Sequence, residues 1–238
     1  MEEGIRLNKY LSDAGYCSRR QADRLIGEGR VSVDGIKAVM GQRISRESKI
    51  LVDGKPVKRT AAPVLLAVNK PVGVITTSEK AEPANIVTYV GYPERIYPIG
   101  RLDKDSEGLI LMTNQGELAN RIAHARGLHE KEYIVSVNRP VTREFTEKMA
   151  AGVKIGENLT TRPCRCEKIS RTRFRIVLTQ GLNRQIRRMC EALGYKVLEL
   201  RRVRIMNITL GDLRLGEYRV IAGDEYDELL RELGMELT

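Results

Sequence analysis

The spacing of apolar residues over the first thirty positions predicts two short helices. Apolar side chains recur at helical intervals over 7–14 and again over 22–26. Gly15 can end the first helix in the left-handed conformation. Ser18 and Gln21 form a capping-box pattern ahead of the second helix, because their side chains can satisfy free backbone N–H groups.

The pattern then changes to alternation, which predicts short strands. Residues 31–33 and 50–52 alternate and each run into an Asp-Gly pair, a strong signal for a hairpin turn. Residues 59–63 show no periodicity, which is typical of a linker. We therefore expect one small domain over 1–60 and a larger domain over 61–238.

The larger domain mixes strands and helices in an uneven order. Apolar runs predict strands over 64–68, 109–112, 132–137, 173–178 and 197–200, and helical spacing predicts helices over 117–125, 143–151 and 184–193. This order lacks the regular strand–helix alternation of a doubly wound fold. We therefore predict the α+β class.

Charge is sorted along the chain. The net charge is +10, and residues 162–204 hold 13 Lys and Arg against 3 Asp and Glu. Residues 1–60 hold 13 Lys and Arg against 8 Asp and Glu, whereas residues 217–238 hold 2 Lys and Arg against 7 Asp and Glu. This distribution favours a polyanionic partner on one side of the protein, and a generally basic surface is the alternative interpretation.

The sequence also argues against a membrane protein and a metal site. It has no run of 18 uncharged apolar residues, and its acidic N-terminus lacks the apolar stretch of a secretory signal, so we expect a cytoplasmic protein. No cysteine pair has C-x-x-C spacing, and both histidines lie far from the cysteines. We expect reduced thiols and no bound metal. These residues are Cys17, Cys164, Cys166, Cys190, His124 and His129.

The two predicted helices of the first domain leave a basic face free of apolar residues. Such a face suits the phosphate backbone of a nucleic acid, which it would bind with salt-sensitive and largely sequence-independent affinity. The stretch RLNKYLSDAGYCSRRQADRLIGEGRVSVDG resembles an S4 RNA-binding domain, which implies binding to structured RNA. The expected RNA-binding residues here are Arg6, Lys9, Arg19, Arg20 and Arg24, with Arg30 close by.

The stretch GRLDKDSEGL places an aspartate, Asp103, between two cations. Asp103 lies two residues after Arg101 and one before Lys104. It can belong to a plain surface turn, to a structural ion pair, or to a site where an ionised carboxylate does chemistry. The third interpretation requires a pocket that shields the carboxylate and a guanidinium that keeps it charged.

The stretch QGLNRQIRRM supplies candidate guanidinium groups. Arg184 and Arg188 share one face of the predicted helix, while Arg187 points elsewhere. Ile186 and Met189 must be buried, so Arg187 lies at the margin of the core and would pair with a carboxylate. A solvated charged helix is the alternative.

Three motifs in order are similar to those of the RsuA/Rlu family of pseudouridine synthases. They are G-R-L-D-x-D-S-x-G-L, K-E-Y and Q-G-L-N-R-Q-I-R-R-M, and the resemblance runs over about 65–215. The third motif is most similar to the RluF branch, which acts on 23S ribosomal RNA. The resemblance implies a mixed, mostly antiparallel sheet flanked by helices, and an isomerase that needs no cofactor. It also implies ribosomal RNA as the partner, with tRNA as another possible substrate; we expect a monomer.

The resemblance assigns roles to individual residues. Asp103 matches the catalytic aspartate, and Arg187 matches the basic residue that pairs with it. Tyr133 matches a tyrosine that packs on the target base, although it also lies in an alternating stretch where core packing is the simpler interpretation. Arg101 matches a residue that enters the RNA stack. Arg184 and Arg188 are expected to contact RNA. A base must leave its helix to react, and stacking on a tyrosine offsets part of that cost.

Two other functions are consistent with parts of the sequence. A non-catalytic ribosome-binding or assembly factor would use the same S4 domain and basic surface. A glycosidase or nucleoside hydrolase would need Asp103 and Asp105 to act together, but on an extended segment their side chains would face opposite ways. Asp103 itself can attack the sugar, attack C6 of the base or remove a sugar proton.

Overall fold

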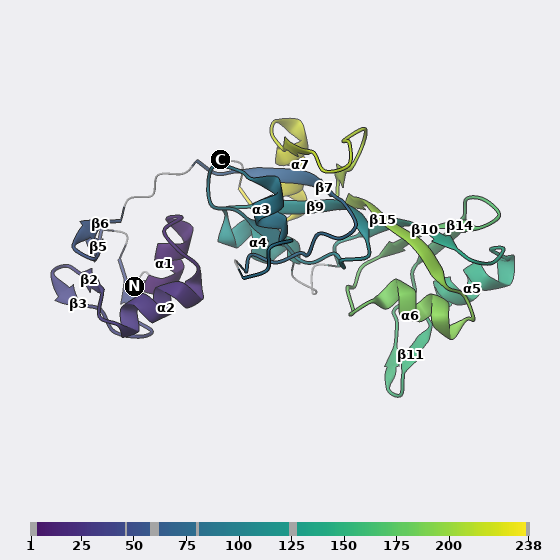
Figure 1. Cartoon of the computed structure of the whole chain (residues 1–238), viewed down its shortest axis with the longest axis horizontal. Coiled ribbons are helices and arrows are strands. Elements are labelled where there is room, and N and C mark those ends of the chain that lie inside the picture. The colour runs from purple at the N-terminus through teal and green to yellow at the C-terminus, as the bar shows by residue number, and fades with distance from the viewer. Residues whose placement is uncertain (1–3, 46, 58–61, 80, 124–127, 237–238) are drawn as a thin grey trace. The chain divides into compact units, whose positions relative to one another are not determined.

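The computed structural model describes residues 4–45, 47–57, 62–79, 81–123 and 128–236 (Figure 1). The chain forms two compact units. The first comprises Met1–Pro63 with the short segments Pro93–Arg95 and Asn114–Gly116, and the second comprises Val64–Tyr92, Ile96–Thr113 and Glu117–Thr238. The expected boundary between residues 60 and 61, most of the expected linker, and His124 lie outside the described residues.

The first unit packs two helices against small sheets. Ser18 caps α2, where its Oγ accepts a hydrogen bond from the N–H of Gln21. Both expected Asp-Gly turns form, with positive φ at both residues, as a type I′ hairpin turn requires. The helices are α1 (Leu7–Asp13) and α2 (Arg19–Gly27); the strands are β1 (Ile5–Arg6), β2 (Val31–Val33), β3 (Ile36–Lys37), β4 (Arg43–Ile44), β5 (Ile50–Val52) and β6 (Lys55–Pro56).

The second unit is built on a nine-stranded sheet. Its strands follow the order β13-β14-β10-β15-β9-β7-β17, with β16 beside β15 and β8 beside β9. Neighbouring strands are antiparallel except β15 and β9, which are parallel. The strands are β7 (Leu65–Lys70), β8 (Tyr97–Ile99), β9 (Glu107–Thr113), β10 (Lys131–Val137), β13 (Arg165–Lys168), β14 (Arg173–Leu178), β15 (Val197–Ile205), β16 (Ile208–Thr209) and β17 (Tyr218–Val220).

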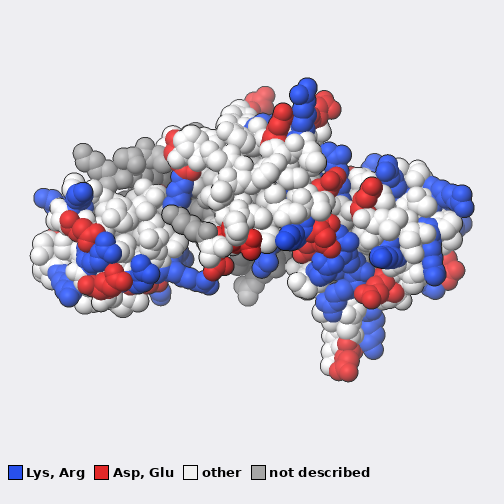
Figure 2. Space-filling view, viewed as in Figure 1, with Lys and Arg blue, Asp and Glu red and all other residues white. Residues whose placement is uncertain are grey.

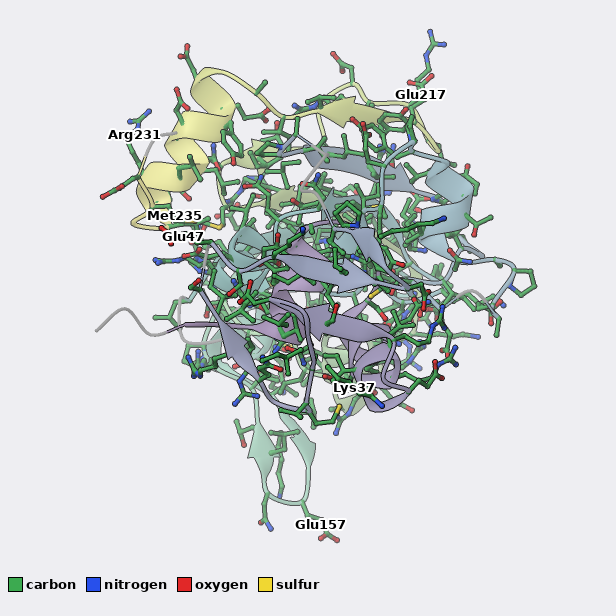
Figure 3. All side chains as sticks on the ribbon, turned by 90° about the vertical axis from the view of Figure 1, so that its left-hand side faces the viewer. Lys37, Glu47, Glu157, Glu217, Arg231 and Met235 are labelled. Atoms are coloured by element: carbon green, nitrogen blue, oxygen red, sulfur yellow. The ribbon has the colours of Figure 1, made fainter. Side chains whose placement is uncertain are left out.

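Helices and a hairpin surround this sheet. The helices are α3 (Ile86–Val90), α4 (Gly116–Ala123), α5 (Arg143–Ala151), α6 (Gln185–Ala192) and α7 (Asp224–Glu232). The strands β11 (Lys154–Gly156) and β12 (Leu159–Thr160) form a separate hairpin that projects from the unit, with Glu157 at its tip (Figure 3). No helix in the described residues is both long enough and apolar enough to cross a membrane.

Both faces of the central strands are covered, which explains their continuous apolar runs. In β7, Leu65 and Ala67 join the apolar cluster under α4 and α7, whereas Leu66 and Val68 join the cluster that includes α3. Successive strand residues point to opposite faces, so a strand covered on both sides must be apolar throughout. A further cluster lies under α5 and α6 and is built around Phe174.

Gly108 permits the parallel contact between β9 and β15. It pairs with Arg202, and a Cβ atom at Gly108 would lie 2.3 Å from the carbonyl oxygen of Arg202. Its φ of +103° is also unfavourable for any residue with a side chain. Only glycine therefore allows the two strands to approach this closely, near the end of the GRLDKDSEGL stretch.

The α+β class and the mostly antiparallel sheet are as predicted, and every predicted strand and helix of the second unit is present. Helix α6 begins at Gln185 because Arg184 is in the left-handed conformation, with φ of 48°. Helix α4 ends at Ala123 among the described residues, and the predicted end at residue 125 lies outside them.

Candidate active site

The three motifs meet around one cavity in the second unit, with a volume of about 480 Å³. The loop before β9 supplies Arg101 and Asp103, β10 supplies Tyr133, and the segment leading into α6 supplies Arg184 and Arg187. Lys and Arg side chains gather over the part of this unit that carries β10, β14, β15 and α6 (Figure 2). The sheet thus brings together residues that are far apart in the sequence.

The loop that carries Asp103 is tied to the chain just after β7. The Thr76 hydroxyl donates to the carbonyl of Leu102 at 2.7 Å and accepts from the N–H of Leu102 at 3.2 Å. The N–H of Gly73 donates to the carbonyl of Lys104 at 2.8 Å. Leu102 is buried in the core on one side of Asp103. The backbone around Asp103 is therefore fixed before any substrate binds.

Asp103 lines the cavity, but its side chain is 39% exposed. The expected shielding from water is thus only partial in this structure. The N–H of Ser106 donates to the Asp103 carbonyl at 3.1 Å, so residues 103–106 form a turn.

The ion pairs of this turn differ from the expected ones. Arg187 contacts Asp105: its Nε lies 3.4 Å from Oδ2, and its Nη2 donates to the Asp105 carbonyl at 2.7 Å and to the Ser106 hydroxyl at 3.2 Å. Arg184 is the residue whose guanidinium reaches the Asp103 carboxylate, at 3.9 Å. The prediction of a direct ion pair between Arg187 and Asp103 is therefore wrong for this structure, where Arg187 pairs with Asp105. Both arginines line the same cavity as Asp103.

Asp105 and Asp103 are not on opposite sides, as an extended segment would place them. Arg184 donates to Oδ1 and Oδ2 of Asp105 at 3.1 and 2.9 Å while it also reaches Asp103. The turn brings both carboxylates to one guanidinium. The hydrogen bonds from Arg184, followed by the charges of Arg187 and Arg184, hold the pKa of Asp105 below its ordinary value.

Tyr133 lies between the core and the cavity. It is 9% exposed, belongs to the cluster under α5 and α6, and also lines the cavity. It pairs with Ile176 on one neighbouring strand and Arg202 on the other. Core packing and contact with a substrate are thus both available to this side chain.

The other expected RNA-binding residues have different surroundings. Arg101 is exposed at the cavity. Arg188 donates to the Ile155 carbonyl and, at 3.5 Å, to the Asn183 carbonyl, which ties α6 to the β11–β12 hairpin. In the first unit, Lys9 pairs with Asp13 at 3.0 Å and Arg24 with Glu28 at 3.3 Å. The remaining arginines of that set are exposed, namely Arg6, Arg19 and Arg20.

Three buried or half-buried cations near the cavity are missing from the sequence prediction. Lys70 is fully buried; its Nζ donates to the carbonyls of Pro71 and Val74 at 2.9 and 2.8 Å. Burial, followed by the charge of Arg202, lowers its pKa to about 8. Lys131 and Arg202 line the cavity itself. The apolar run around Lys70 is the one signal in the sequence that indicates its burial.

Burial keeps the cysteine thiols of the second unit protonated. Burial raises the pKa of Cys164 to about 11 and those of Cys166 and Cys190 to about 12. A thiol that stays protonated is neither a good nucleophile nor a good metal ligand. In the described part of the chain, no three His, Cys, Asp or Glu side chains are grouped so that they could hold a metal ion.

Comparisons with known proteins identify the family of this chain. The family model for RNA pseudouridylate synthases matches residues 64–192, and the model for the S4 domain matches residues 5–39. The chain is 47% identical to the dual-specificity RNA pseudouridine synthase RluF of Escherichia coli K12, over 97% of this chain and 80% of that protein. It is 35% identical to the ribosomal large subunit pseudouridine synthase B of Bacillus subtilis, over 94% and 95%.

A solved structure gives the same result in three dimensions. The crystal structure of a pseudouridylate synthase superimposes with a TM-score of 0.69 and 28% identity, over 96% of this chain and 99% of that one. Sequence and fold therefore agree over nearly the whole length. The chain belongs to the RluF branch of the RsuA/Rlu family of RNA pseudouridylate synthases and is an isomerase that forms pseudouridine in RNA.

Proposed function

We propose that this enzyme converts a uridine of large-subunit ribosomal RNA into pseudouridine, with Asp103 as the reacting carboxylate. The observation that carries the proposal is the make-up of the cavity. Among the described residues that line it, Asp103 is the one carboxylate, and the cations around it include Arg101, Arg184 and Arg187. A single carboxylate in a basic cavity suits a substrate that is itself a polyanion.

The reaction requires few groups. The N1–C1′ bond breaks, the uracil turns, a C5–C1′ bond forms, and a proton moves from C5 to N1. Atoms and electrons balance without an external donor or acceptor. The protein must hold a flipped nucleotide beside an ionised carboxylate, and a cavity of about 480 Å³ falls in the size range of small-molecule sites.

Each cavity residue has a role in this proposal. Asp103 attacks C1′, attacks C6 or takes a sugar proton, and each route starts from the ionised carboxylate. Tyr133 stacks on the extruded uracil, which stabilises the flipped state by about 1–3 kcal/mol. Arg101 fills the gap left in the RNA. Arg184, whose guanidinium lies 3.9 Å from the Asp103 carboxylate, and Arg187 supply positive charge to the cavity.

The choice of RNA rests on the relatives and on the first unit. The Bacillus subtilis relative is named for the large ribosomal subunit. The exposed arginines of the S4 domain suit a phosphate backbone, which favours a structured RNA. We expect the protein to act as a monomer in the cytoplasm and to need no cofactor.

The deciding experiment replaces Asp103 with Asn, which keeps the size of the side chain and removes its charge. The unaltered protein should form pseudouridine in a large-subunit RNA transcript, whereas Asp103→Asn should lose this activity and keep its RNA affinity. Asp212→Asn, at an exposed aspartate outside the cavity, is the matched control. Normal product yield from Asp103→Asn would remove the catalytic assignment and favour a carboxylate with a purely structural role.

A second experiment identifies the substrate. Pseudouridines are mapped in ribosomal RNA and tRNA from cells with and without the protein. We expect a large-subunit uridine to lose its modification in the deleted strain. An unchanged map of large-subunit RNA together with a change in tRNA would overturn the choice of substrate but not the reaction.

A further inference from the structure

Arg202 occupies the middle of the sheet, beneath the cavity. It lies on β15, pairs with Tyr133 of β10 and Gly108 of β9, and is only 3% exposed. It is also one of the residues that line the cavity. A guanidinium is thus buried in the protein interior, on a residue that lines the active site.

The hydrogen bonds of Arg202 leave part of its guanidinium without an acceptor. Nε donates to the carbonyl of Leu109 at 2.6 Å, and Nη1 reaches the carbonyl of Arg101 at 3.4 Å. Nη2 is buried and has no hydrogen-bond partner. Among the described residues, Arg202 also has no carboxylate within ion-pair distance. A buried charge without a counter-ion is costly to the fold, so its presence requires a reason.

The charge of Arg202 adds to a positive field in this region. Burial is the main cause that lowers the pKa of Lys131, and the charge of Arg202 lowers it further. The same two causes act on Lys70. Desolvation strengthens any interaction of such cations with an anion that enters the cavity.

A structural role accounts for only some of these features. The bonds to Leu109 and Arg101 connect β15 to β9 and to the Asp103 loop, and a neutral amide could donate both. Neither bond uses Nη2, and neither needs a positive charge. The charge, buried close to the cavity, is what would stabilise developing negative charge on a bound ligand.

We propose that Arg202 is a further catalytic residue, whose guanidinium stabilises negative charge on the uracil ring while C1′ moves from N1 to C5. The inference rests on the proposed function of the cavity. When the N1–C1′ bond breaks, its electron pair remains on the uracil and spreads over N1, O2 and O4. The pair is then used to form the C5–C1′ bond, and the proton lost from C5 is regained at N1.

The proposed role of Arg202 is the same for each reaction path that starts from Asp103. Attack at C1′ expels the uracil as an anion, and so does removal of a sugar proton with loss of the base. Attack at C6 moves the electrons of the C5–C6 bond into the ring and its O4. Each route therefore places negative charge on the ring in the cavity, where a buried donor is most effective.

The test compares Arg202→Gln with Arg202→Lys in the full-length protein. The readout is the single-turnover release of tritium from C5 of uridine in the RNA, with RNA affinity and circular dichroism measured in parallel. We expect Gln to slow turnover by about 10²–10³-fold, and Lys, which keeps the charge, to slow it clearly less. Arg201→Gln, on the same strand with a half-exposed side chain, is the matched control and should keep the normal rate.

Chemical rescue separates charge from shape. Arg202→Ala opens a space that free guanidinium can enter, and the uncharged urea has a similar size. We expect millimolar guanidinium to raise the rate of Arg202→Ala with saturation, and urea to have no such effect. Equal rescue by urea, no rescue by guanidinium in a folded variant, or a normal rate for Arg202→Gln would each overturn the inference.

These outcomes are distinguishable from a failure of the proposed function. If the unaltered protein releases no tritium from any ribosomal RNA substrate, the proposed function itself fails. If the unaltered protein is active and Arg202→Gln is equally active, the proposed function stands and the role of Arg202 is wrong. Should Arg202→Ala not fold, the comparison of Gln with Lys decides the question alone.

Discussion

Lys70 offers a quantitative test of the electrostatics behind the active site. Its ammonium is fully buried and is held by the carbonyls of Pro71 and Val74, two neutral acceptors. Burial and the nearby charge of Arg202 lower its pKa from 10.5 to about 8. The folded state therefore binds the Lys70 proton less tightly than the unfolded state does, so the charged form of Lys70 destabilises the folded protein.

The direction of the pH effect follows from proton linkage. Below pH 8 the lysine is protonated in both states, and the full cost of the buried charge, about 3 kcal/mol, reduces the free energy of unfolding. Between pH 8 and 10.5 the folded state loses the proton first, so stability rises with pH. From pH 7 to pH 10 the linkage relation gives a gain of about 2.5 kcal/mol from this one group.

The assay compares the unaltered protein with Lys70→Met in urea unfolding at several pH values. Methionine has a similar length and no charge. Subtracting the free energies of unfolding of the two proteins at each pH cancels the contribution of all other titrating groups. We expect the stability of the unaltered protein, relative to Lys70→Met, to rise by about 2.5 kcal/mol from pH 7 to pH 10. Lys148→Met, at an exposed lysine, should give a flat difference over this range. A flat or falling difference for Lys70 would refute the reasoning.

Three further predictions test other parts of the structure. Gly108→Ala should lower the free energy of unfolding by about 2–4 kcal/mol, because its Cβ would clash with the β15 backbone at a residue with positive φ. Gly181→Ala, where a Cβ meets no neighbour, should lower the free energy of unfolding much less, and similar urea midpoints for the two variants would contradict this. Asp105→Asn should cut kcat by about 10²-fold at unchanged RNA affinity, because two arginines lose their anchor; a normal kcat would mean that Asp105 is dispensable. The double change Arg19→Gln and Arg20→Gln should reduce the slope of the logarithm of RNA affinity against the logarithm of salt concentration by about 1–2. An unaltered slope would exclude contact of these residues with phosphate.

Local sequence patterns were sufficient for most of the secondary structure. The hairpin turns, the Ser18 cap and the strands of the second unit depend on short-range preferences and on burial periodicity, which are visible in a single sequence. The motifs also indicated which residues share the cavity. The secondary-structure predictions succeed because each depends on neighbours along the chain.

The ion pairs and the buried charges of the site depend on long-range geometry and could not be predicted from local sequence patterns. The pairing of Arg187 with Asp105 results from a turn at 103–106 and from the left-handed Arg184 at the start of α6. Arg202 looks like one more cation in a basic stretch until the sheet places it between β10 and β9. Burial of a charge is a property of the assembled sheet, which residue spacing does not reveal.

The two hydrogen bonds between Thr76 and Leu102 have a consequence for substrate choice. They hold both backbone polar groups of Leu102, the residue before Asp103, so the loop has little freedom to adjust to different RNAs. Adaptation must then come from the nucleic acid. A uridine whose surroundings are easy to distort, such as one beside a bulge or a weak base pair, would reach the fixed carboxylate at lower cost than an equally exposed uridine in a stiff helix.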